Sequence, residues 1–339
     1  MGTLPVRAND DRTGDPMPLH CRPVMLEELP RCQALTAAWG RGVHTEATRA
    51  ALQEVWRTLL TDGSLVMYVF EDDALAGSER IQGFVAAGFA TDAWANEVLH
   101  HDRPYLCRQL VDATLRGERL LLPQRLHGDA NGGDGVHAFG LDFGMTSSDW
   151  YRPSVVRWFP AMERSLRDWV GGWKLRSIVR EMFGHDTYAL ARVAGYPLLR
   201  DLRRAVPADT PARERPYLCG TTRTLALRRP SSVAARLFLY SEPVFVFSPG
   251  EQAVLRLARD AMSDDAIAAA LHVSPHTVKM RWRRVFDEVL ARQPALLPDD
   301  ASPLEHRRGS EKRRHLLAYL REHPEELRPR RARRTHPDR

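Results

Sequence analysis

The sequence predicts an α+β body, a mixed sheet with flanking helices, followed by an all-α C-terminal domain. Segments rich in β-branched, aromatic and small apolar residues predict four strands, at residues 64–70, 80–90, 136–144 and 217–227. Helical patterns lie between them in groups, an order typical of α+β folds rather than of repeating βαβ units. Near the C-terminus, three helix starts follow one another within residues 247–289 with no strand between them.

Apolar residues spaced three and four apart define the helical patterns of the body. They predict helices over residues 25–39, 46–60, 92–99, 103–116, 153–183 and 185–194, with a break or kink at Gly171-Gly172. A loop is predicted at residues 126–135. The secondary structure of residues 231–247 is ambiguous, except that residues 244–247 are expected to be extended. The predicted domains are a disordered N-terminus (1–19), an α+β body (20–245), a helical domain (246–293), and a linker with short helices and a basic tail (294–339).

The charge of the chain is unevenly distributed. The chain has 339 residues, a length that predicts about two domains, and 43% of its residues are hydrophobic, which is enough to form a buried core. Its formal net charge is +6, but residues 306–339 alone carry 12 Lys and Arg against 5 Asp and Glu. The body is therefore nearly neutral, so it is not expected to wrap nucleic acid. A local basic surface is expected only at the C-terminal end.

The four cysteines lie far apart, at Cys21, Cys32, Cys107 and Cys219. Because no C-x-x-C pair and no histidine cluster accompanies them, neither a disulfide framework nor a structural zinc site is expected, and no metal or cofactor is predicted. No apolar run reaches transmembrane length, and the N-terminus lacks an apolar secretory core. The sequence predicts a cytoplasmic protein.

A serine occupies the N-cap position of each C-terminal helix start. Ser248 is followed by proline and, three residues on, by Glu251, which is a capping box. Ser263 is followed by two aspartates, whose charges suit the positive end of a helix dipole, and Ser274 is followed by proline. The short link 272–274 gives the second and third helices the proportions of a helix-turn-helix.

The third of these helices has an apolar stripe and a cationic face. The stripe consists of Val278, Trp282, Val285 and Val289, and the cations are Lys279, Arg281, Arg283 and Arg284. A helix-turn-helix places such a helix in the DNA major groove, where arginine can read guanine and lysine meets phosphate or guanine. An amphipathic three-helix bundle with a solvated basic face is the alternative that the residues leave open.

This stretch resembles the C-terminal DNA-binding domain of LuxR/FixJ-type bacterial transcription regulators. The matching residues are Ser248-Pro249, Glu251, Val254-Leu255, Ser263, Ile267-Ala268, Leu271, Val273-Ser274 and Thr277-Val278-Lys279. The resemblance implies that Lys279, Met280 and Arg283 face double-stranded DNA, with Thr277 and Arg284 near its backbone. The departures from the family pattern are Ala261, Ala266, Met280 and Arg281, so a preferred DNA sequence is not implied. Regulators of this type commonly bind as dimers, which implies a homodimer.

The order of predicted elements between residues 23 and 227 resembles the GNAT acyltransferase fold. Residues 189–202 (ALARVAGYPLLRDL) are similar to the late helix of that family and the strand after it. The family holds the pyrophosphate of coenzyme A on a glycine-rich turn at a helix N-terminus after its central strand. Residues 145–152 lack glycine, and Asp149 would repel an anion, so the sequence predicts a body that does not acetylate.

Several smaller groups have a plain structural explanation beside a functional one. The glycines of residues 128–135 fit no phosphate-binding pattern, and His100-His101-Asp102 is interpreted as a solvated helix end rather than a metal site. Glu181 and His185 are interpreted as a surface helix pair rather than a base–acid pair. Core or interface packing is expected of the tryptophans Trp150, Trp158, Trp169 and Trp173 rather than a ligand pocket.

The function predicted from the sequence is a non-enzymatic DNA-binding transcriptional regulator. Its body would bind an unidentified small-molecule effector or serve dimerisation, and phosphorylation is disfavoured because no receiver-like acidic arrangement is present. An acyl-coenzyme A-dependent N-acyltransferase fused to a DNA-binding domain is the alternative. A body that only dimerises is a third hypothesis.

Overall fold

A computed structural model describes residues 19–39, 44–146, 158–228, 232–298 and 305–330. The strands in these ranges form one seven-stranded sheet in the order β1-β2-β3-β4-β5-β7-β6. Their bounds are β1 Leu19–Pro23, β2 Leu65–Asp72, β3 Ile81–Ala90, β4 Val136–Met145, β5 Leu175–Phe183, β6 Leu198–Asp201 and β7 Pro216–Thr222. The β4–β5 pair is parallel and the other pairs in this sheet are antiparallel, so the sheet is mixed as predicted.

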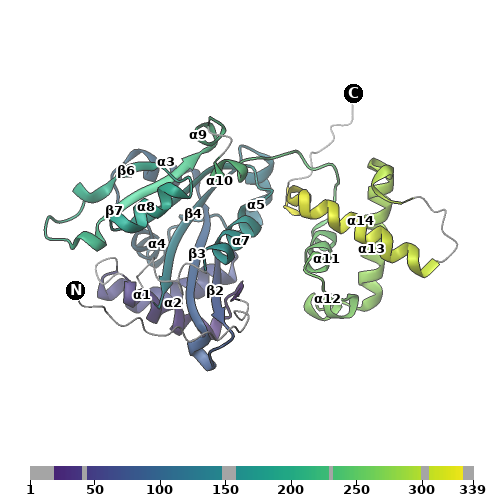
Figure 1. Cartoon of the computed structure of the whole chain (residues 1–339), viewed down its shortest axis with the longest axis horizontal. Helices are drawn as coiled ribbons and strands as arrows, with labels where there is room; N and C mark the ends of the chain where they lie inside the picture. The colour runs from purple at the N-terminus through teal and green to yellow at the C-terminus, as the bar shows by residue number, and fades with distance from the viewer. Residues whose placement is uncertain (1–18, 40–43, 147–157, 229–231, 299–304, 331–339) are drawn as a thin grey trace, which may run out of the picture.

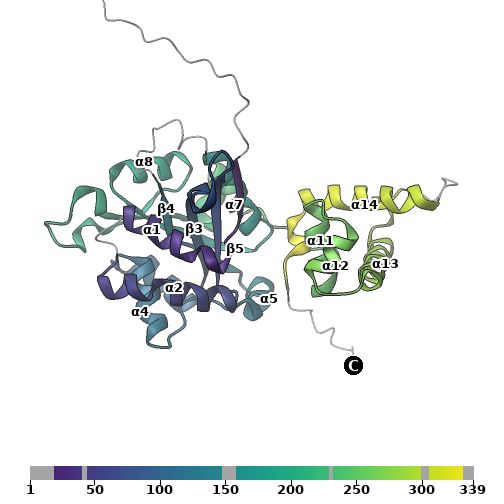
Figure 2. The same ribbon diagram turned by 90° about the horizontal axis from the view of Figure 1, so that it is seen from below.

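Helices cover both faces of this sheet (Figures 1 and 2). Those of the body are α1 Leu29–Trp39, α2 Glu46–Thr61, α3 Asp92–His100, α4 Leu106–Leu115, α5 Gln124–Gly132, α7 Phe159–Val170, α8 His185–Val193, α9 Arg223–Leu227 and α10 Val233–Arg236. The C-terminal helices are α11 Pro249–Arg259, α12 Asp264–Ala270, α13 Pro275–Arg292 and α14 Glu305–Glu322, followed by the 3-10 turn η6 Pro324–Leu327. Helices α1, α2 and α4 lie on one face of the sheet, and α7 and α8 lie on the other.

The pleat of β2 distributes its side chains between the two faces. Leu65, Met67 and Val69 join the core beneath α1, α2 and α4, where Trp56 meets Phe84 edge-on with ring centroids 5.5 Å apart. The intervening residues of β2 face α7 and α8, because successive strand side chains point to opposite faces. Each large apolar side chain buried in this way stabilises the fold by roughly 1.5–3 kcal/mol.

Helix α2 illustrates how local sequence produces a predicted element. The Thr45 side chain accepts the backbone N–H of Thr48 at 3.1 Å, which satisfies one of the unpaired amides at the helix start. Buried residues then recur at helical spacing, at Leu52, Val55, Trp56 and Leu59. The predicted helix 46–60 is confirmed.

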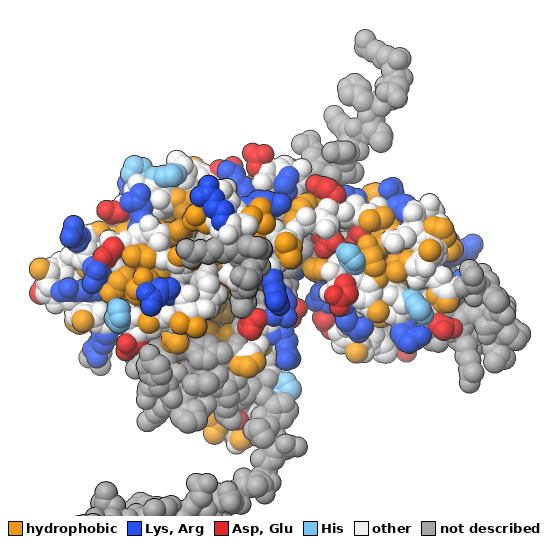
Figure 3. All heavy atoms as spheres, turned by 45° about the horizontal axis from the view of Figure 1, so that its top comes forward, with side chains coloured by type: hydrophobic (Ala, Val, Ile, Leu, Met, Phe, Trp, Pro, Cys, Tyr) orange, Lys and Arg blue, Asp and Glu red, His pale blue; other side chains and the backbone are white. Residues whose placement is uncertain are grey.

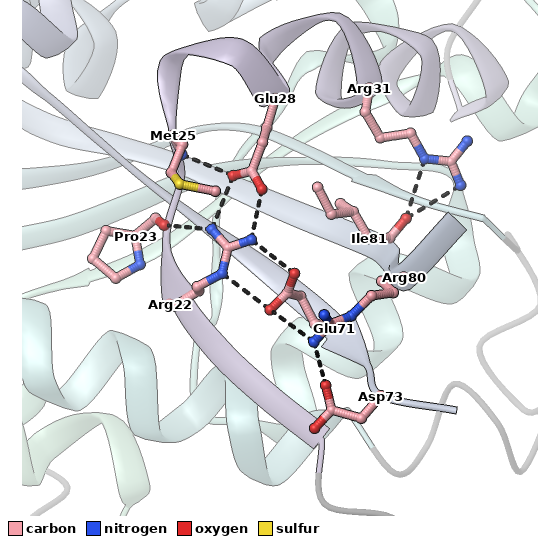
Figure 4. Close-up of polar contacts among 9 residues, drawn as sticks. All are labelled: Arg22, Pro23, Met25, Glu28, Arg31, Glu71, Asp73, Arg80 and Ile81. Atoms are coloured by element: carbon pink, nitrogen blue, oxygen red, sulfur yellow. Dashed lines mark hydrogen bonds and ion pairs between the residues drawn. The ribbon is translucent and has the colours of Figure 1, made fainter. Parts of the chain in front are cut away.

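An arginine ties the edge strand β1 to its neighbour (Figure 4). Both carboxylate oxygens of Glu71 on β2 accept hydrogen bonds from Arg22, at 3.0 and 2.7 Å. Both oxygens of Glu28, which follows β1, accept from the other side of the same guanidinium, at 2.9 and 2.6 Å. The guanidinium geometry suits two such bidentate pairs, so Arg22 fixes β1 and the chain after it against the sheet.

The structure departs from the sequence prediction in the region after α7. The helix predicted over residues 153–183 is wrong, because α7 ends before Gly171 and residues 175–183 form the central strand β5. Gly172 has a φ of +78°, a conformation that ends the helix and that side-chain-bearing residues rarely adopt. A strand buried on both faces lacks the alternating pattern that identifies a half-exposed one, which explains the error.

Three further elements differ from the sequence prediction. The strand predicted at residues 217–227 ends at Thr222, and Arg223–Leu227 form helix α9 instead. Residues 126–135, predicted as a loop, mostly belong to helix α5, which buries Asn131. The Asn131 side chain accepts the backbone N–H of Lys174 at 2.9 Å and holds the helix against the start of β5. Strand β1 was not predicted either, because its apolar and polar residues alternate over only five positions and end in a proline. Most of the predicted disordered N-terminus, and the basic tail after residue 330, lie outside the described residues.

The C-terminal helices have a hydrophobic core of their own. Trp282 and Val285 of α13, Leu255 of α11 and Leu316 and Leu320 of α14 share one cluster that is separate from the clusters beneath the sheet. Figure 1 shows these helices beside the body, next to α5 and α7. None of the helices in the described ranges is both long and apolar enough to cross a membrane.

The segment after α14 contacts the body. Arg328 donates hydrogen bonds to the carbonyl oxygens of Gly171 at 2.8 Å and Asp168 at 2.5 Å, and its guanidinium lies 5.4 Å from the Trp173 ring. The Asn131 side chain donates to the carbonyl of Pro329 at 3.2 Å. Figure 3 shows cations on both parts of the molecule, without one dominant basic patch on the face in view.

Candidate active site

Strands β4 and β5 diverge halfway along their length. They pair in parallel from Val136 and Leu175 as far as Gly140 and Arg180. Beyond these residues β4 continues beside β3, and β5 continues beside β7. The register of β4 against β3 shifts at the divergence, with Leu141 as the extra residue of a β-bulge. Bulges bend a strand, so Leu141 accounts for part of the separation.

A cavity of about 1750 Å³ occupies the divergence. On one face of the sheet it is bounded by α7 and α8, through side chains that include Met162, Trp169 and Leu190. On the other face it reaches Thr36 of α1 and Cys107 of α4. It is larger than the roughly 300–1,000 Å³ of a typical small-molecule site, and because residues of both sheet faces line it, it has room for two ligands that approach from opposite sides.

Glu181 of β5 is a half-buried acid in the lining of this cavity. Its carboxylate accepts the backbone N–H of Tyr105 at 2.6 Å and of Leu106 at 2.8 Å. Burial nevertheless raises the pKa of Glu181 to about 7, and the two amide hydrogen bonds only partly oppose that effect. A carboxyl with a pKa near neutrality is suited to take up and release a proton in catalysis.

A second polar cluster lies beside Glu181. The thiol of Cys107 donates to Oδ2 of Asp142 at 3.4 Å, and Nε2 of His44 lies 3.5 Å from the same oxygen. Burial, followed by the nearby Asp142 charge, holds the pKa of the Cys107 thiol well above its usual value. Neither ring nitrogen of His44 has a hydrogen bond in the described structure, although both are buried. The 3.5 Å separation is thus an ion-pair distance and not a hydrogen bond.

Beside the carboxylates Glu163, Asp186 and Glu214, six arginines line the cavity. They are Arg167, Arg180, Arg203, Arg213, Arg215 and Arg236. Desolvation lowers the pKa of Arg180, the one among them on β5, which lies near Tyr196 and Cys219. Guanidinium groups in such a lining are suited to bind phosphate, and two of these, Arg167 and Arg203, also pair with Glu163 and Asp201.

Glu181 and His185, which the sequence singled out as a pair, both line this cavity, but the arrangement predicted for them was wrong. Glu181 and His185, predicted as a surface helix pair, lie in different elements, because Glu181 lies in β5 and His185 begins α8. Asp142 was detectable, since a carboxylate inside the apolar strand 136–145 is unusual. His44 and Cys107 carry no local signal, because only the fold brings them to Asp142.

The smaller groups singled out in the sequence lie mostly in the core or at helix ends. Trp169 and Trp173 pack on Phe89 in the core, although Trp169 also lines the cavity, and Trp158 packs against Phe70. His100 ends α3, and Asp102 pairs with Arg200. Trp150 and the glycine-free link after residue 146 lie outside the described residues.

The residues predicted to contact DNA lie on α13, away from the cavity lining. The side chains of Lys279, Arg283 and Arg284 are exposed, and those of Thr277 and Met280 are half-buried. At 100° per residue Met280, Arg283 and Arg284 fall on the side opposite the buried stripe that contains Trp282, and Thr277 and Lys279 fall on its two flanks. The five positions therefore share the half of α13 that faces away from this stripe.

The sequence matches no family model and none of the curated proteins compared with it. Among solved structures, the chain is similar to Arabidopsis thaliana NAA60 in complex with acetyl-CoA, with 16% identity and a TM-score of 0.38 over 60% of this chain and 98% of that one. It is similar to the spermidine/spermine N-acetyltransferase SpeG from Vibrio cholerae, with 9% identity and a TM-score of 0.37 over 63% of this chain and 98% of that one. A third match is the C-terminal condensation domain of Ebony, with 13% identity and a TM-score of 0.38 over 61% of this chain and 99% of that one.

These similarities concern the part of the chain that resembles GNAT acyltransferases and do not bear on the LuxR/FixJ resemblance. The prediction that the chain is not an enzyme is contradicted, because the neighbours include N-acetyltransferases. With TM-scores below 0.5 the matches assign no residue of this chain a role. The divergence of β4 and β5 and the cavity between them are independent of these matches.

Proposed function

We propose that the body is an acyl-coenzyme A-dependent N-acyltransferase. The observation that carries this proposal is the cavity at the divergence of β4 and β5, which is lined from both faces of the sheet. A transferase needs such a site, because donor and acceptor must meet while entering from different directions. The donor occupies the side of α7 and α8, and the acceptor occupies the side of α1 and α4.

The donor side matches the chemistry of coenzyme A. Its pantetheine arm is an extended chain with amide groups, and it can pair with the edge of β5 that no described strand covers after Arg180. Apolar walls at Met162, Leu166 and Leu190 accommodate the methylene groups. The arginines of the cavity lining supply cations for the phosphates of coenzyme A.

Glu181 is placed to act as general base on the acceptor side. Its carboxylate has about four acceptor positions, of which two are taken by the amides of Tyr105 and Leu106. As the amine attacks the thioester carbonyl, the new C–N bond forms, the C–S bond breaks and the amine proton passes to Glu181. Coenzyme A leaves as its thiolate and takes a proton from solvent.

The full chain should first be tested for acetyl-coenzyme A binding by calorimetry, and then for release of the coenzyme A thiol with amine acceptors. Glu181→Gln should lower kcat by about 100-fold or more, with a smaller change in KM for acetyl-coenzyme A, and should remove the limb of the pH profile near pH 7. Glu118→Gln, which changes a glutamate paired on the surface with Arg116, is the control and should retain the wild-type rate. A wild-type protein that binds no acetyl-coenzyme A would refute the proposal.

We propose a second function, DNA binding by α13, on the strength of the cationic face described above. Lys279 and Arg283 lie one turn apart and exposed, on a helix that Ser274 caps by accepting the N–H of Thr277 at 3.1 Å. Lys279, Met280 and Arg283 would contact bases or phosphates, with Thr277 and Arg284 near the backbone. Two copies in a homodimer would present two such helices one DNA turn apart, and a ligand in the cavity would serve as effector.

The test uses a random-sequence pool of DNA duplexes and fluorescence anisotropy at several salt concentrations. Lys279→Ala with Arg283→Ala should weaken binding and flatten the dependence of log K on log salt by about 0.9 for each phosphate that is no longer neutralised. Arg292→Ala, at the far end of the same helix and paired with Glu288, is the matched control. An unchanged affinity and salt slope in the double variant would exclude α13 as the DNA-binding surface.

A further inference from the structure

Three metal-binding side chains converge at the cavity from separate parts of the fold. His44 precedes α2, Cys107 lies in the first turn of α4, and Asp142 lies on β4 next to the bulge. One nitrogen, sulfur or oxygen atom from each lies within 4.8 Å of the others. All three side chains line the cavity, so an ion held among them would face the space between β4 and β5.

The two separations from Asp142 fit the coordination sphere of a zinc-like ion. Tetrahedral bonds of about 2.1 Å to nitrogen and oxygen and about 2.3 Å to sulfur place neighbouring ligand atoms about 3.4–3.6 Å apart. The observed separations from Oδ2 of Asp142 are 3.5 Å to Nε2 of His44 and 3.4 Å to Sγ of Cys107. Oδ1 of Asp142 accepts the backbone N–H of Phe143 at 2.8 Å, which turns Oδ2 toward the other two residues.

The unsatisfied histidine is an independent indication of a ligand. The side chain of His44 is only 1% exposed, and Nε2 points to the cluster without making a hydrogen bond. A buried polar atom without a partner carries a free-energy cost, and such atoms in native proteins commonly have an ion or water as their partner. A cation on Nε2 would remove that cost.

Charge balance also favours a divalent cation. When the Cys107 thiol loses its proton on metal binding, the site contains one thiolate, one carboxylate and one neutral imidazole. Two negative charges and one divalent ion sum to zero, which suits a buried site. Because the thiolate is the form that binds a metal, binding should release the proton of the Cys107 thiol.

We propose that His44, Cys107 and Asp142 bind one divalent transition-metal ion of the zinc class, with an open coordination position toward the cavity. A site with three protein ligands and an open position is the arrangement of catalytic rather than structural zinc. The ion would bind a water molecule or a donor atom of a ligand in the cavity at that position. This site is independent of the assignment of acyl transfer to the body.

The test uses metal-free full-length protein titrated with Co²⁺ and no coenzyme A. The expected result is a thiolate-to-cobalt charge-transfer band that saturates at one equivalent per chain, with release of one proton, and Zn²⁺ should abolish the band by displacing Co²⁺. Cys107→Ser should lose the band, and His44→Gln should weaken Co²⁺ affinity at least about 10-fold. Cys219→Ser replaces another buried thiol on β7, outside the cluster, and should behave as wild type.

A second measurement guards against a variant that does not fold. In the unaltered protein, Zn²⁺ should slow the reaction of Cys107 with a thiol reagent, as identified by mass spectrometry, and leave that of Cys219 unchanged. Absence of the cobalt band in the wild type, or its persistence in Cys107→Ser, would overturn the proposal. Because no acyl donor is present, either result leaves the acyltransferase proposal to be decided by its own experiment.

Discussion

Glu181 accepts a 2.6 Å hydrogen bond from the backbone N–H of Tyr105, although 76 residues separate the two in the sequence. Tyr105 precedes α4 and has a φ of +66°, an uncommon conformation for a residue with a side chain. The contact fixes the start of α4 against β5. The same contact holds the Glu181 carboxyl at the divergence of the strands. Burial of this carboxyl makes the stability of the protein depend on pH.

Glu181 should make the stability of the wild-type protein fall with rising pH. Burial raises the pKa of its carboxyl from an ordinary value of 4.5 to about 7. Between these values the native protein retains a proton that the unfolded chain has released, so stability decreases from about pH 4.5 to about pH 7 and then levels off. Urea unfolding should show that Glu181→Gln removes about 3 kcal/mol of this decrease. Parallel pH dependences in the two proteins would contradict the assignment.

Replacing Arg22 should destabilise the sheet at its β1 edge (Figure 4). Arg22→Met leaves the carboxylates of Glu28 and Glu71, whose side chains are 12% and 9% exposed, without their shared cation. The expected loss is about 2–3 kcal/mol, less than for a fully buried pair because Arg22 itself is 31% exposed. Arg22→Lys should restore only part of it, since an ammonium cannot make two bidentate pairs.

The control for Arg22 is Arg116→Met, which removes an exposed pair with Glu118 and should alter stability far less. The Arg22 effect should also depend on pH in a defined direction. Arg22 lowers the pKa of Glu28, so this contribution is present above the ordinary carboxyl pKa and is lost as the pH falls through the lowered value. The two proteins should therefore approach each other in stability in acid, and a difference that grew in acid would be incompatible with this account.

Glu326 should control the local stability of the C-terminal helices. Its carboxylate accepts the backbone N–H groups of Val244 at 2.8 Å and Phe245 at 3.0 Å, and the Tyr319 hydroxyl at 3.2 Å. Glu326→Gln replaces one carboxylate oxygen with an amide NH2 group, which would face the N–H and O–H donors that now bond to Glu326. The expected loss of stability is about 1–3 kcal/mol. Proteolysis near residues 243–248 should accelerate, while Glu322→Gln on the exposed side of α14 should leave the rate unchanged. Equal rates in the two variants would rule out this role.

Arg328 should hold the C-terminal helices against the body. It donates to the carbonyls of Gly171 and Asp168 and lies over Trp173, and desolvation lowers its pKa to about 10. Arg328→Ala should increase the radius of gyration measured by small-angle X-ray scattering, because an alanine side chain can neither reach these carbonyls nor cover the Trp173 ring. Arg321→Ala, an exposed change on α14, should leave it unchanged. A compact Arg328→Ala variant would show that other interactions suffice.

The sequence by itself determined the elements whose signals are local. Serine caps and helical spacing identified α11, α12 and α13, whose N-caps are Ser248, Ser263 and Ser274 as predicted, and strand patterns identified β2, β3, β4 and β7. These signals succeed because capping and side-chain periodicity depend on residues within one or two turns.

Only the tertiary structure decided the rest. Residues 175–183 become a strand because β4 and β7 flank them and both faces are buried, a condition set by distant residues. For the same reason, Glu181 meets Tyr105, and Asp142 meets His44 and Cys107, through interactions between separate elements. The acid–base properties of the cavity depend on ionisable side chains that lose water and gain new partners when the chain folds. The residues adjacent to each of these side chains in the sequence do not reveal those partners.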